Sequence, residues 1–148
     1  MTSDLQALYR DVIVDHNRHP RNFRTLEVGY KAEGVNPLCG DRLTVYVRVE
    51  NGAIQDVGFQ GLGCAIATAS ASLMTEGVKG KTVAEADALF ERVQRFVTAS
   101  SDAPIDGLGA LSALAGVRRF PIRVKCAMLA WHAMRAAAAA TDQVVTTE

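Results

Sequence analysis

Three cysteines and one aspartate are the side chains of this sequence that could best carry chemistry. Cys39 and Asp41 belong to the turn-forming run Asn-Pro-Leu-Cys-Gly-Asp, Cys64 ends the run Gly-Leu-Gly-Cys, and Cys126 lies near the expected start of the last helix. An odd number of cysteines cannot pair completely as disulfides within one chain. In a reducing compartment they stay free, and their thiolates bind metals or attack sulfur. A single cysteine is often only a small buried hydrophobe, but these three fall at junctions between expected elements.

Two of these cysteines, Cys64 and Cys126, are expected near helix N-termini, where the helix dipole and free amides favour the thiolate. Three thiolates need a fourth ligand to complete a tetrahedral zinc site. Asp41 is the best candidate because it lies two residues from Cys39, and the intervening Gly40 lets both side chains reach one ion. The alternative for Asp41 is an aspartate that stabilises a turn or caps a helix.

The ligand types also bear on the kind of site. A carboxylate is the weakest ligand in such a set, and an exchangeable position suits a reactive zinc site, whereas closed structural sites normally use cysteine and histidine. We predict that Cys39, Asp41, Cys64 and Cys126 hold one zinc ion.

The remaining polar residues give weaker signals. His16 and His19 lie at the end of the first expected helix, where they are expected to be charge partners of that end or surface groups. His132 is six residues beyond Cys126 and faces away from it on a regular helix. The glycine-rich run at 61–63 is too short for a dinucleotide-binding or phosphate-binding loop, and the sequence supports no Ser/His/Asp triad.

The hydrophobic pattern predicts the elements that position these residues. Strict alternation over 43–50 predicts a half-buried strand, Asn-Gly at 51–52 a tight hairpin turn, and 54–59 the returning strand, with a weaker strand at 28–35. Helical spacing precedes these strands at 5–13 and follows them at 65–76, 82–96, 108–114 and 121–131. This order favours an α+β domain, a small antiparallel three-stranded sheet with helices packed on one face.

Several residues predict where the helices begin and end. Capping boxes at 3–6 and 82–85 are expected to open two of them, and Pro121 fits the first turn of the last helix. Gly77 is a plausible C-terminal cap for the second helix.

Length and composition limit the function classes. A chain of 148 residues is expected to form one domain over 1–140, with a flexible tail over 141–148. Sixteen basic residues balance sixteen acidic ones, so no global charge attracts nucleic acid or a membrane. The apolar runs are too short to span a bilayer, and the N-terminus lacks the pattern of a signal peptide. We expect a cytoplasmic protein.

The cysteine motifs in their order resemble the U-type scaffold family of iron–sulfur cluster assembly, the IscU and NifU N-terminal-like proteins. The runs Asn-Pro-x-Cys-Gly-Asp, Gly-x-Gly-Cys-Ala-Ile and Val-Lys-Cys-Ala carry the resemblance, which extends from the N-terminal helix to about residue 136. Within the family the sequence is similar to the SufU branch. The segment between Cys64 and Cys126 is extended, with the extra residues expected near 98–116, and Lys125 stands where the IscU branch has a histidine ligand.

The resemblance implies a SufE/NifU-like fold and a role for each site residue. Cys39, Asp41, Cys64 and Cys126 match the metal ligands of the family, and Cys39 matches its sulfur acceptor. SufU-like proteins take persulfide sulfur from a SufS-type, pyridoxal-phosphate-dependent cysteine desulfurase. Arg123, three residues before Cys126, is either a support for the site or a solvated surface arginine.

Three functions stay open at this point. The first is a zinc-dependent sulfurtransferase, the second a scaffold for a nascent [2Fe–2S] or [4Fe–4S] cluster, and the third a structural zinc domain. Lys125 in place of histidine favours the first over the second. Asp41 in place of a further cysteine or histidine favours either of these over the third.

Overall fold

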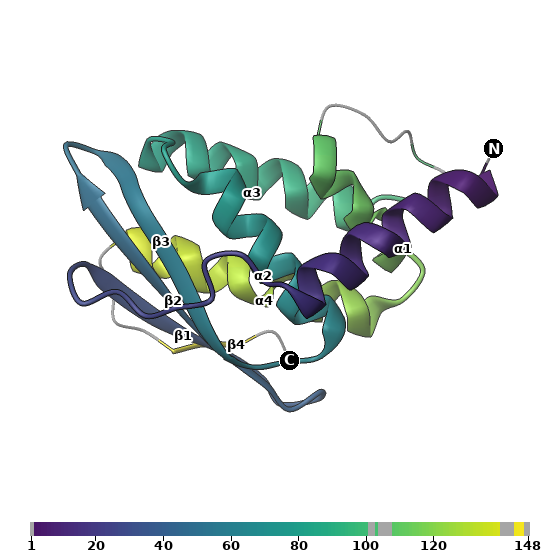
Figure 1. Cartoon of the computed structure of the whole chain (residues 1–148), viewed down its shortest axis with the longest axis horizontal. Helices are drawn as coiled ribbons and strands as arrows, with labels where there is room; N and C mark the ends of the chain where they lie inside the picture. The colour runs from purple at the N-terminus through teal and green to yellow at the C-terminus, as the bar shows by residue number, and fades with distance from the viewer. Residues whose placement is uncertain (1, 101–102, 104–107, 140–143, 147–148) are drawn as a thin grey trace.

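A four-stranded sheet forms one layer of the molecule (Figure 1). The structure is a computed structural model that describes residues 2–100, 103, 108–139 and 144–146. Strands β1 (Tyr30–Asn36), β2 (Asp41–Glu50) and β3 (Ala53–Leu62) are antiparallel neighbours. The short β4 (Val144–Thr146) pairs in parallel with β1, which gives the order β3-β2-β1-β4. The predicted antiparallel three-stranded sheet is confirmed, and β4 adds to its edge.

The sheet follows the alternation of apolar residues along its central strand. Leu43, Val45 and Val47 are fully buried under the helices, and the residues between them are half-buried. Asn51 and Gly52 have φ angles of 55° and 76°, the left-handed values that a tight hairpin turn requires at both of its central residues. The predicted hairpin is therefore present between β2 and β3.

The helices pack on one face of this sheet. They are α1 (Thr2–Arg18), α2 (Ala65–Val78), α3 (Val83–Thr98), the 3-10 helix η1 (Gly109–Val117) and α4 (Pro121–Ala138). Helix α4 lies directly on β1 and β2, and α2 packs between α4 and α1. Because α2 begins next to Cys64 and α4 contains Cys126, the packing of these two helices decides where both sulfurs lie.

A buried hydrogen-bond chain ties α2 to α4. Trp131 is fully buried, and its Nε1 donates to the Ser70 hydroxyl at 3.1 Å. That hydroxyl donates in turn to the Ala127 carbonyl oxygen at 2.6 Å. Buried polar groups that are fully paired select one packing of a core, because any shift leaves a donor or acceptor unsatisfied. The two helices therefore hold a defined register.

The helix ends confirm some of the predictions and correct others. Thr82 and Glu85 form the predicted capping box, with reciprocal hydrogen bonds of 3.0 and 2.9 Å, and Pro121 opens α4. Gly77 does not cap α2, which continues to Val78. A Cβ at Gly77 would lie 3.3 Å from a Leu89 methyl group, so the glycine permits close packing against α3.

Two expectations at the chain ends also differ from the structure. Helix α1 begins at Thr2, so Ser3 lies inside the helix and is not its N-cap. Residues 144–146, which we expected in a flexible tail, form β4. The rest of that tail and most of the loop at 101–107 lie outside the described residues, and the single domain over 1–140 stays a prediction. Among the described residues, no helix has the length and apolar character needed to cross a membrane.

Candidate metal centre

Cys39 lies at the tip of the turn that joins β1 to β2. The carbonyl oxygen of Asn36 accepts hydrogen bonds from the backbone N–H groups of Cys39 at 3.2 Å and Gly40 at 2.9 Å. The Asn36 Oδ1 accepts another from the N–H of Leu38 at 3.2 Å. Gly40 has φ +73°, which glycine adopts without strain. This bonding leaves Cys39 exposed, while Asp41, the first residue of β2, is 2% exposed.

Asp41 connects this turn to the start of α2. Its Oδ1 accepts the backbone N–H of Cys64 at 2.8 Å, and its Oδ2 lies 3.8 Å from the Cys64 Sγ. Cys64 is the N-cap of α2, and its Sγ accepts the N–H of Ala67 at 3.4 Å. The predicted place of Cys64 at a helix start is confirmed, and its sulfur satisfies one of the free amides of the first turn.

Cys126 enters the cluster from α4. It is 2% exposed, and its thiol donates to the Cys39 Sγ at 3.3 Å. Burial raises the pKa of the Cys126 thiol, and hydrogen bonds with Cys39 and Asp41 act in the same direction. Helix α4 begins at Pro121, so Cys126 lies in the second turn, where the effect of the helix end has faded. The expectation that a helix start favours the Cys126 thiolate is therefore wrong.

Three of the four predicted ligands lie in one cluster. One ligand atom each from Cys39, Asp41 and Cys126 lies within 4.8 Å of the others. Cys64 is not part of that cluster, and it lies beside it with its Sγ 3.8 Å from Asp41 Oδ2. Zinc–sulfur bonds of about 2.3 Å in a tetrahedron separate neighbouring ligand atoms by about 3.8 Å. Two thiolates and a carboxylate this close, with the Cys64 sulfur beside them, repel one another, and a divalent cation offsets the repulsion. The donor set fits zinc, and metal binding by these residues stays a prediction.

Asn36 is a site residue that the sequence interpretation missed. It is fully buried, and its Nδ2 donates to the Cys126 Sγ at 3.5 Å. Its Oδ1 and its backbone carbonyl oxygen accept hydrogen bonds from backbone N–H groups of the Cys39 turn. One residue, through its side chain and its backbone carbonyl, thus links two cysteines that are far apart in sequence. The available signal is the asparagine at the head of the cysteine run, whose sequence context indicates only a turn.

In the described part of the chain, no histidine joins the cysteine cluster. His16 is buried between α1 and α2, with its Nδ1 2.7 Å from the Ser72 hydroxyl. The expectation of a surface group is therefore wrong for this residue, although it lies in the last turn of α1 as expected. Ser72 is itself fully buried, and the pair is a contact between helices. His132 packs edge-on against Phe90 with ring centroids 5.1 Å apart.

The two basic residues before Cys126 lie outside the ligand set. Arg123 is exposed, and its guanidinium carbon lies 4.4 Å from the centroid of the Phe120 ring. This contact agrees with the second of its two interpretations, a solvated surface arginine. Lys125 is half-buried, and a protonated amine has no lone pair for a metal.

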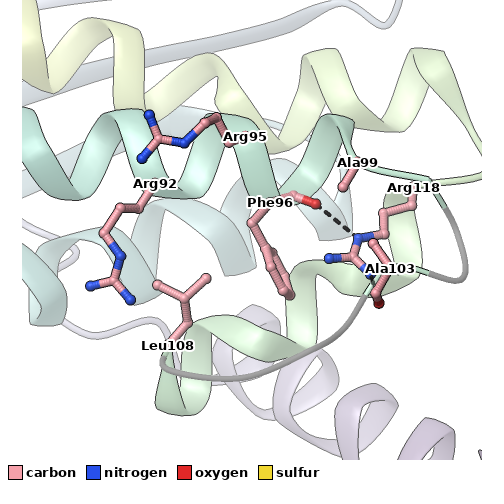
Figure 2. A pocket seen from close by; sticks show the side chains of 7 residues that line it. All are labelled: Arg92, Arg95, Phe96, Ala99, Ala103, Leu108 and Arg118. Carbon is pink, nitrogen blue, oxygen red and sulfur yellow. Dashed lines mark hydrogen bonds between the residues drawn. The ribbon is translucent and has the colours of Figure 1, made fainter.

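A hollow of about 290 Å³ lies elsewhere, between the end of α3 and η1 (Figure 2). Arg118 joins its walls, because its Nε donates to the Phe96 carbonyl oxygen at 2.8 Å and a terminal nitrogen to that of Ala103 at 2.9 Å. The same guanidinium stacks on the Phe96 ring at 4.3 Å. These contacts hold the end of α3 against the segment that follows, so we interpret them as structural and assign the hollow no binding role.

Comparison with known proteins places this geometry in a family. Residues 8–145 match the family model described as the NifU-like N terminal domain. The chain is 39% identical over 133 residues to the zinc-dependent sulfurtransferase SufU of Bacillus subtilis, covering 89% of this chain and 90% of the relative. It is 38% identical to the iron–sulfur cluster assembly scaffold protein IscU of Streptococcus pyogenes, covering 91% and 85%.

Solved structures agree with this assignment. A candidate SUF-system cluster assembly scaffold protein from Fervidobacterium islandicum superposes with a TM-score of 0.79 at 31% identity, covering 86% of this chain and 94% of that one. A crystal structure described only as a hypothetical protein has a TM-score of 0.82 at 38% identity, covering 90% and 98%. The resemblance inferred from the cysteine motifs is therefore confirmed, and the chain belongs to the NifU-like N-terminal domain family.

Proposed function

We propose that this chain is a zinc-dependent sulfurtransferase of iron–sulfur cluster assembly, which accepts persulfide sulfur from a cysteine desulfurase in the cytoplasm. The observation that carries the proposal is the position of Cys39. Its sulfur lies on an exposed turn and is also 3.3 Å from the buried Cys126 sulfur, in one cluster with Asp41. An exposed sulfur can meet the persulfide of a partner, while the buried donors behind it can hold a metal.

Zinc is the metal that the donor set favours. Sulfur ligands suit zinc, whereas magnesium and calcium take oxygen ligands. When bound, zinc keeps its cysteine ligands deprotonated at neutral pH. The proposed ligands are Cys39, Asp41, Cys64 and Cys126, and the name of the Bacillus subtilis relative supports the same metal.

Cys39 is the proposed sulfur acceptor. Its thiolate attacks the outer sulfur of the desulfurase persulfide, the S–S bond breaks, and the bonding pair leaves with the desulfurase cysteine. Cys39 then carries the persulfide, and the exchange needs no outside oxidant or reductant. Gly40 has open space around it, so the turn can move without disturbing a helix, whereas Cys64 caps α2 and Cys126 lies within α4.

The proposed partner is a SufS-type, pyridoxal-phosphate-dependent cysteine desulfurase. Large apolar side chains are exposed in the three segments that carry the cysteines. They are Leu38 (63%), Leu62 (81%), Phe120 (44%) and Ile122 (57%). Apolar surface of this kind is typical of a protein interaction site. A desulfurase that covers it would bring its persulfide next to Cys39.

Two measurements test this function. Metal analysis of freshly purified protein is expected to find about one zinc per chain, and less than about a tenth of an equivalent of any metal in folded protein would contradict it. After incubation with desulfurase and cysteine, mass spectrometry is expected to place one added sulfur on the Cys39 peptide. Cys39→Ser should remain folded and lose all stimulation of the desulfurase. An active Cys39→Ser chain with sulfur on Cys64 or Cys126 would overturn the assignment.

The second candidate is a scaffold that holds a nascent iron–sulfur cluster for transfer to other proteins. Thiolates also ligate iron–sulfur clusters, and the Streptococcus pyogenes relative is named as a scaffold. An anaerobic visible spectrum separates the two functions, because a cluster absorbs there and a zinc–thiolate site does not. Iron and acid-labile sulfide bound in place of zinc would favour the scaffold.

A further inference from the structure

The Cys39 and Cys126 sulfurs form a pair with opposite surroundings. They are 3.3 Å apart although 87 residues separate them in sequence. Cys39 is exposed, whereas Cys126 is 2% exposed. A group placed on the Cys39 sulfur therefore has solvent on one side and a second cysteine sulfur on the other.

We infer that Cys126 resolves the persulfide formed on Cys39 and thereby releases sulfide from this chain. The inference rests on the proposed function, which supplies the Cys39 persulfide. The Cys126 sulfur attacks the inner sulfur, that is, Cys39 Sγ, and a disulfide forms between the two residues. The persulfide S–S bond breaks, its electron pair leaves with the outer sulfur, and the Cys126 thiol proton completes hydrogen sulfide. Cys126 is oxidised and the outer sulfur is reduced, so the step balances without an outside reagent.

The geometry favours attack on the inner sulfur. Thiol–disulfide exchange proceeds through attack on one sulfur while the other leaves. Because Cys126 lies on the buried side of Cys39 at 3.3 Å, it meets the inner sulfur first, and the outer sulfur departs toward solvent. The two Sγ atoms must close to about 2.05 Å for a disulfide. The Cys39 turn can supply this movement, because Gly40 has no neighbouring heavy atom within 4 Å of where a Cβ would stand.

Asn36 and Asp41 make Cys126, rather than Cys64, the resolving residue. The Asn36 amide lies 3.5 Å from the Cys126 Sγ and its carbonyl oxygen holds the Cys39 turn, so one residue keeps the two sulfurs facing each other. The Cys64 sulfur instead accepts the Ala67 N–H and lies 3.8 Å from Asp41.

One persulfide thus yields one sulfide and one disulfide. Each chain releases sulfide once and then needs a dithiol reductant to restore both thiols. Sulfide is the form of sulfur that an iron–sulfur cluster contains, so the step would change the product of the chain from bound sulfane sulfur to free sulfide.

The test uses the full-length, zinc-bound chain, and a chelator is added only after sulfur loading, because a bound metal would engage both sulfurs. The chain is loaded anaerobically with desulfurase and cysteine, freed of small thiols, treated with the chelator, and followed by sulfide trapping with a bimane and by peptide mass spectrometry. Wild type is expected to release about one sulfide per persulfide lost and to acquire a Cys39–Cys126 disulfide. Cys126→Ser should keep its persulfide, with sulfide release at least about tenfold slower. The control, Gln55→Ala at an exposed position on β3 outside the site, should behave as wild type.

The possible failures are distinguishable. If Cys39 gains no sulfur in a folded chain, the proposed function fails and the inference fails with it. If wild type loads Cys39 but keeps the persulfide, or passes the outer sulfur to Cys126, only the inference is overturned. Sulfide release by Cys126→Ser at the wild-type rate would likewise overturn only the inference. The disulfide and the sulfide stoichiometry are measured on wild type, so the test stands even if Cys126→Ser misfolds.

Discussion

Asp41 has two roles that a single substitution would confuse. Its carboxylate belongs to the proposed ligand set, and its Oδ1 also accepts the backbone N–H of Cys64 at 2.8 Å. Removing an acceptor from this part-buried N–H costs stability even when no metal is involved, at most the roughly 1–3 kcal/mol of a fully buried donor. Experiments on this residue must therefore separate charge from hydrogen bonding.

Substitutions of graded chemistry at Asp41 achieve this separation. Asp41→Asn keeps an oxygen for the Cys64 N–H but loses the charge, so it should weaken zinc retention with little loss of stability without metal. Asp41→Ala should weaken zinc retention and also lower the stability of the metal-free chain. Asp41→Cys should bind zinc more tightly and suppress sulfur transfer, because no weak ligand remains to leave. Chelator competition measures zinc affinity, urea unfolding measures stability, and desulfurase stimulation measures sulfur transfer. Higher stimulation by Asp41→Cys would show that an exchangeable ligand is not needed.

Asn36 gives a second prediction at the residue scale. Asn36→Ala removes the hydrogen bonds to Leu38 and Cys126 from a fully buried position and should lower the free energy of unfolding by about 1–3 kcal/mol. Because the Cys39 turn then loses its side-chain support, Cys39 should react faster with iodoacetamide in the chelated chain. Urea unfolding and timed alkylation measure the two effects, with the exposed Gln55→Ala as control. Unchanged alkylation would mean that the backbone bonds alone hold the turn.

At the scale of elements, α1 is held to α2 by a buried histidine. The Nδ1 of His16 lies 2.7 Å from the Ser72 hydroxyl, which also accepts the Arg21 N–H at 2.8 Å. The direction of the His16–Ser72 hydrogen bond depends on the tautomer of the imidazole. Burial lowers the pKa of His16, and the charge of Arg21 lowers it further, while Glu76 and Asp15 oppose the shift.

This contact predicts how stability depends on pH. The folded state favours neutral His16, so its contribution is fully present above the ordinary pKa of 6.5 and is lost as pH falls below that value toward the lowered pKa. Each unit of lowering corresponds to about 1.4 kcal/mol. His16→Asn keeps a side-chain amide, which can donate or accept a hydrogen bond, near the Nδ1 position without titrating. It should reduce the loss of stability between about pH 6.5 and 5, measured by urea unfolding.

The matched control for this prediction is the exposed His19→Asn, which should retain the acid dependence of wild type. His132 also has a lowered pKa because of burial, so some acid dependence will remain in His16→Asn. Identical pH profiles for wild type and His16→Asn would contradict the role of His16.

At the scale of the whole molecule, the proposed ligands join three separate parts of the fold. They come from the β1–β2 turn with the first residue of β2, from the start of α2, and from the second turn of α4. A metal held by all three parts binds the folded chain more tightly than the unfolded one. Its binding free energy therefore adds to the stability of the fold.

Zinc removal should accordingly lower the melting temperature. A metal at about one hundred times its dissociation constant adds about 2.7 kcal/mol, and 1 kcal/mol changes the melting temperature of a chain of this size by about 2–4 °C. We expect a fall of about 5–10 °C after chelation, measured by calorimetry and reversed by added zinc. The melting temperature of Asp41→Ala should fall less on chelation. An unchanged melting temperature in protein that has lost its zinc would show that the metal does not stabilise the fold.

Short-range patterns in the sequence determined most of the secondary structure. The alternation at 43–49, the Asn-Gly turn, the Thr82 capping box and Pro121 all appear as predicted, because each depends on residues within one strand period or one helical turn. The cysteine runs were likewise sufficient to identify the family. Gly77 was misread because its role depends on packing against another helix.

Only the tertiary structure decided how these parts meet. That Cys126 lies 3.3 Å from Cys39, that Asp41 binds the start of α2, that Asn36 links two cysteines and that His16 is buried against Ser72 all depend on how α2 and α4 pack on the sheet. Such contacts join residues far apart in the chain. No local periodicity encodes them, because the complementary shapes and paired polar groups of the whole core select the packing.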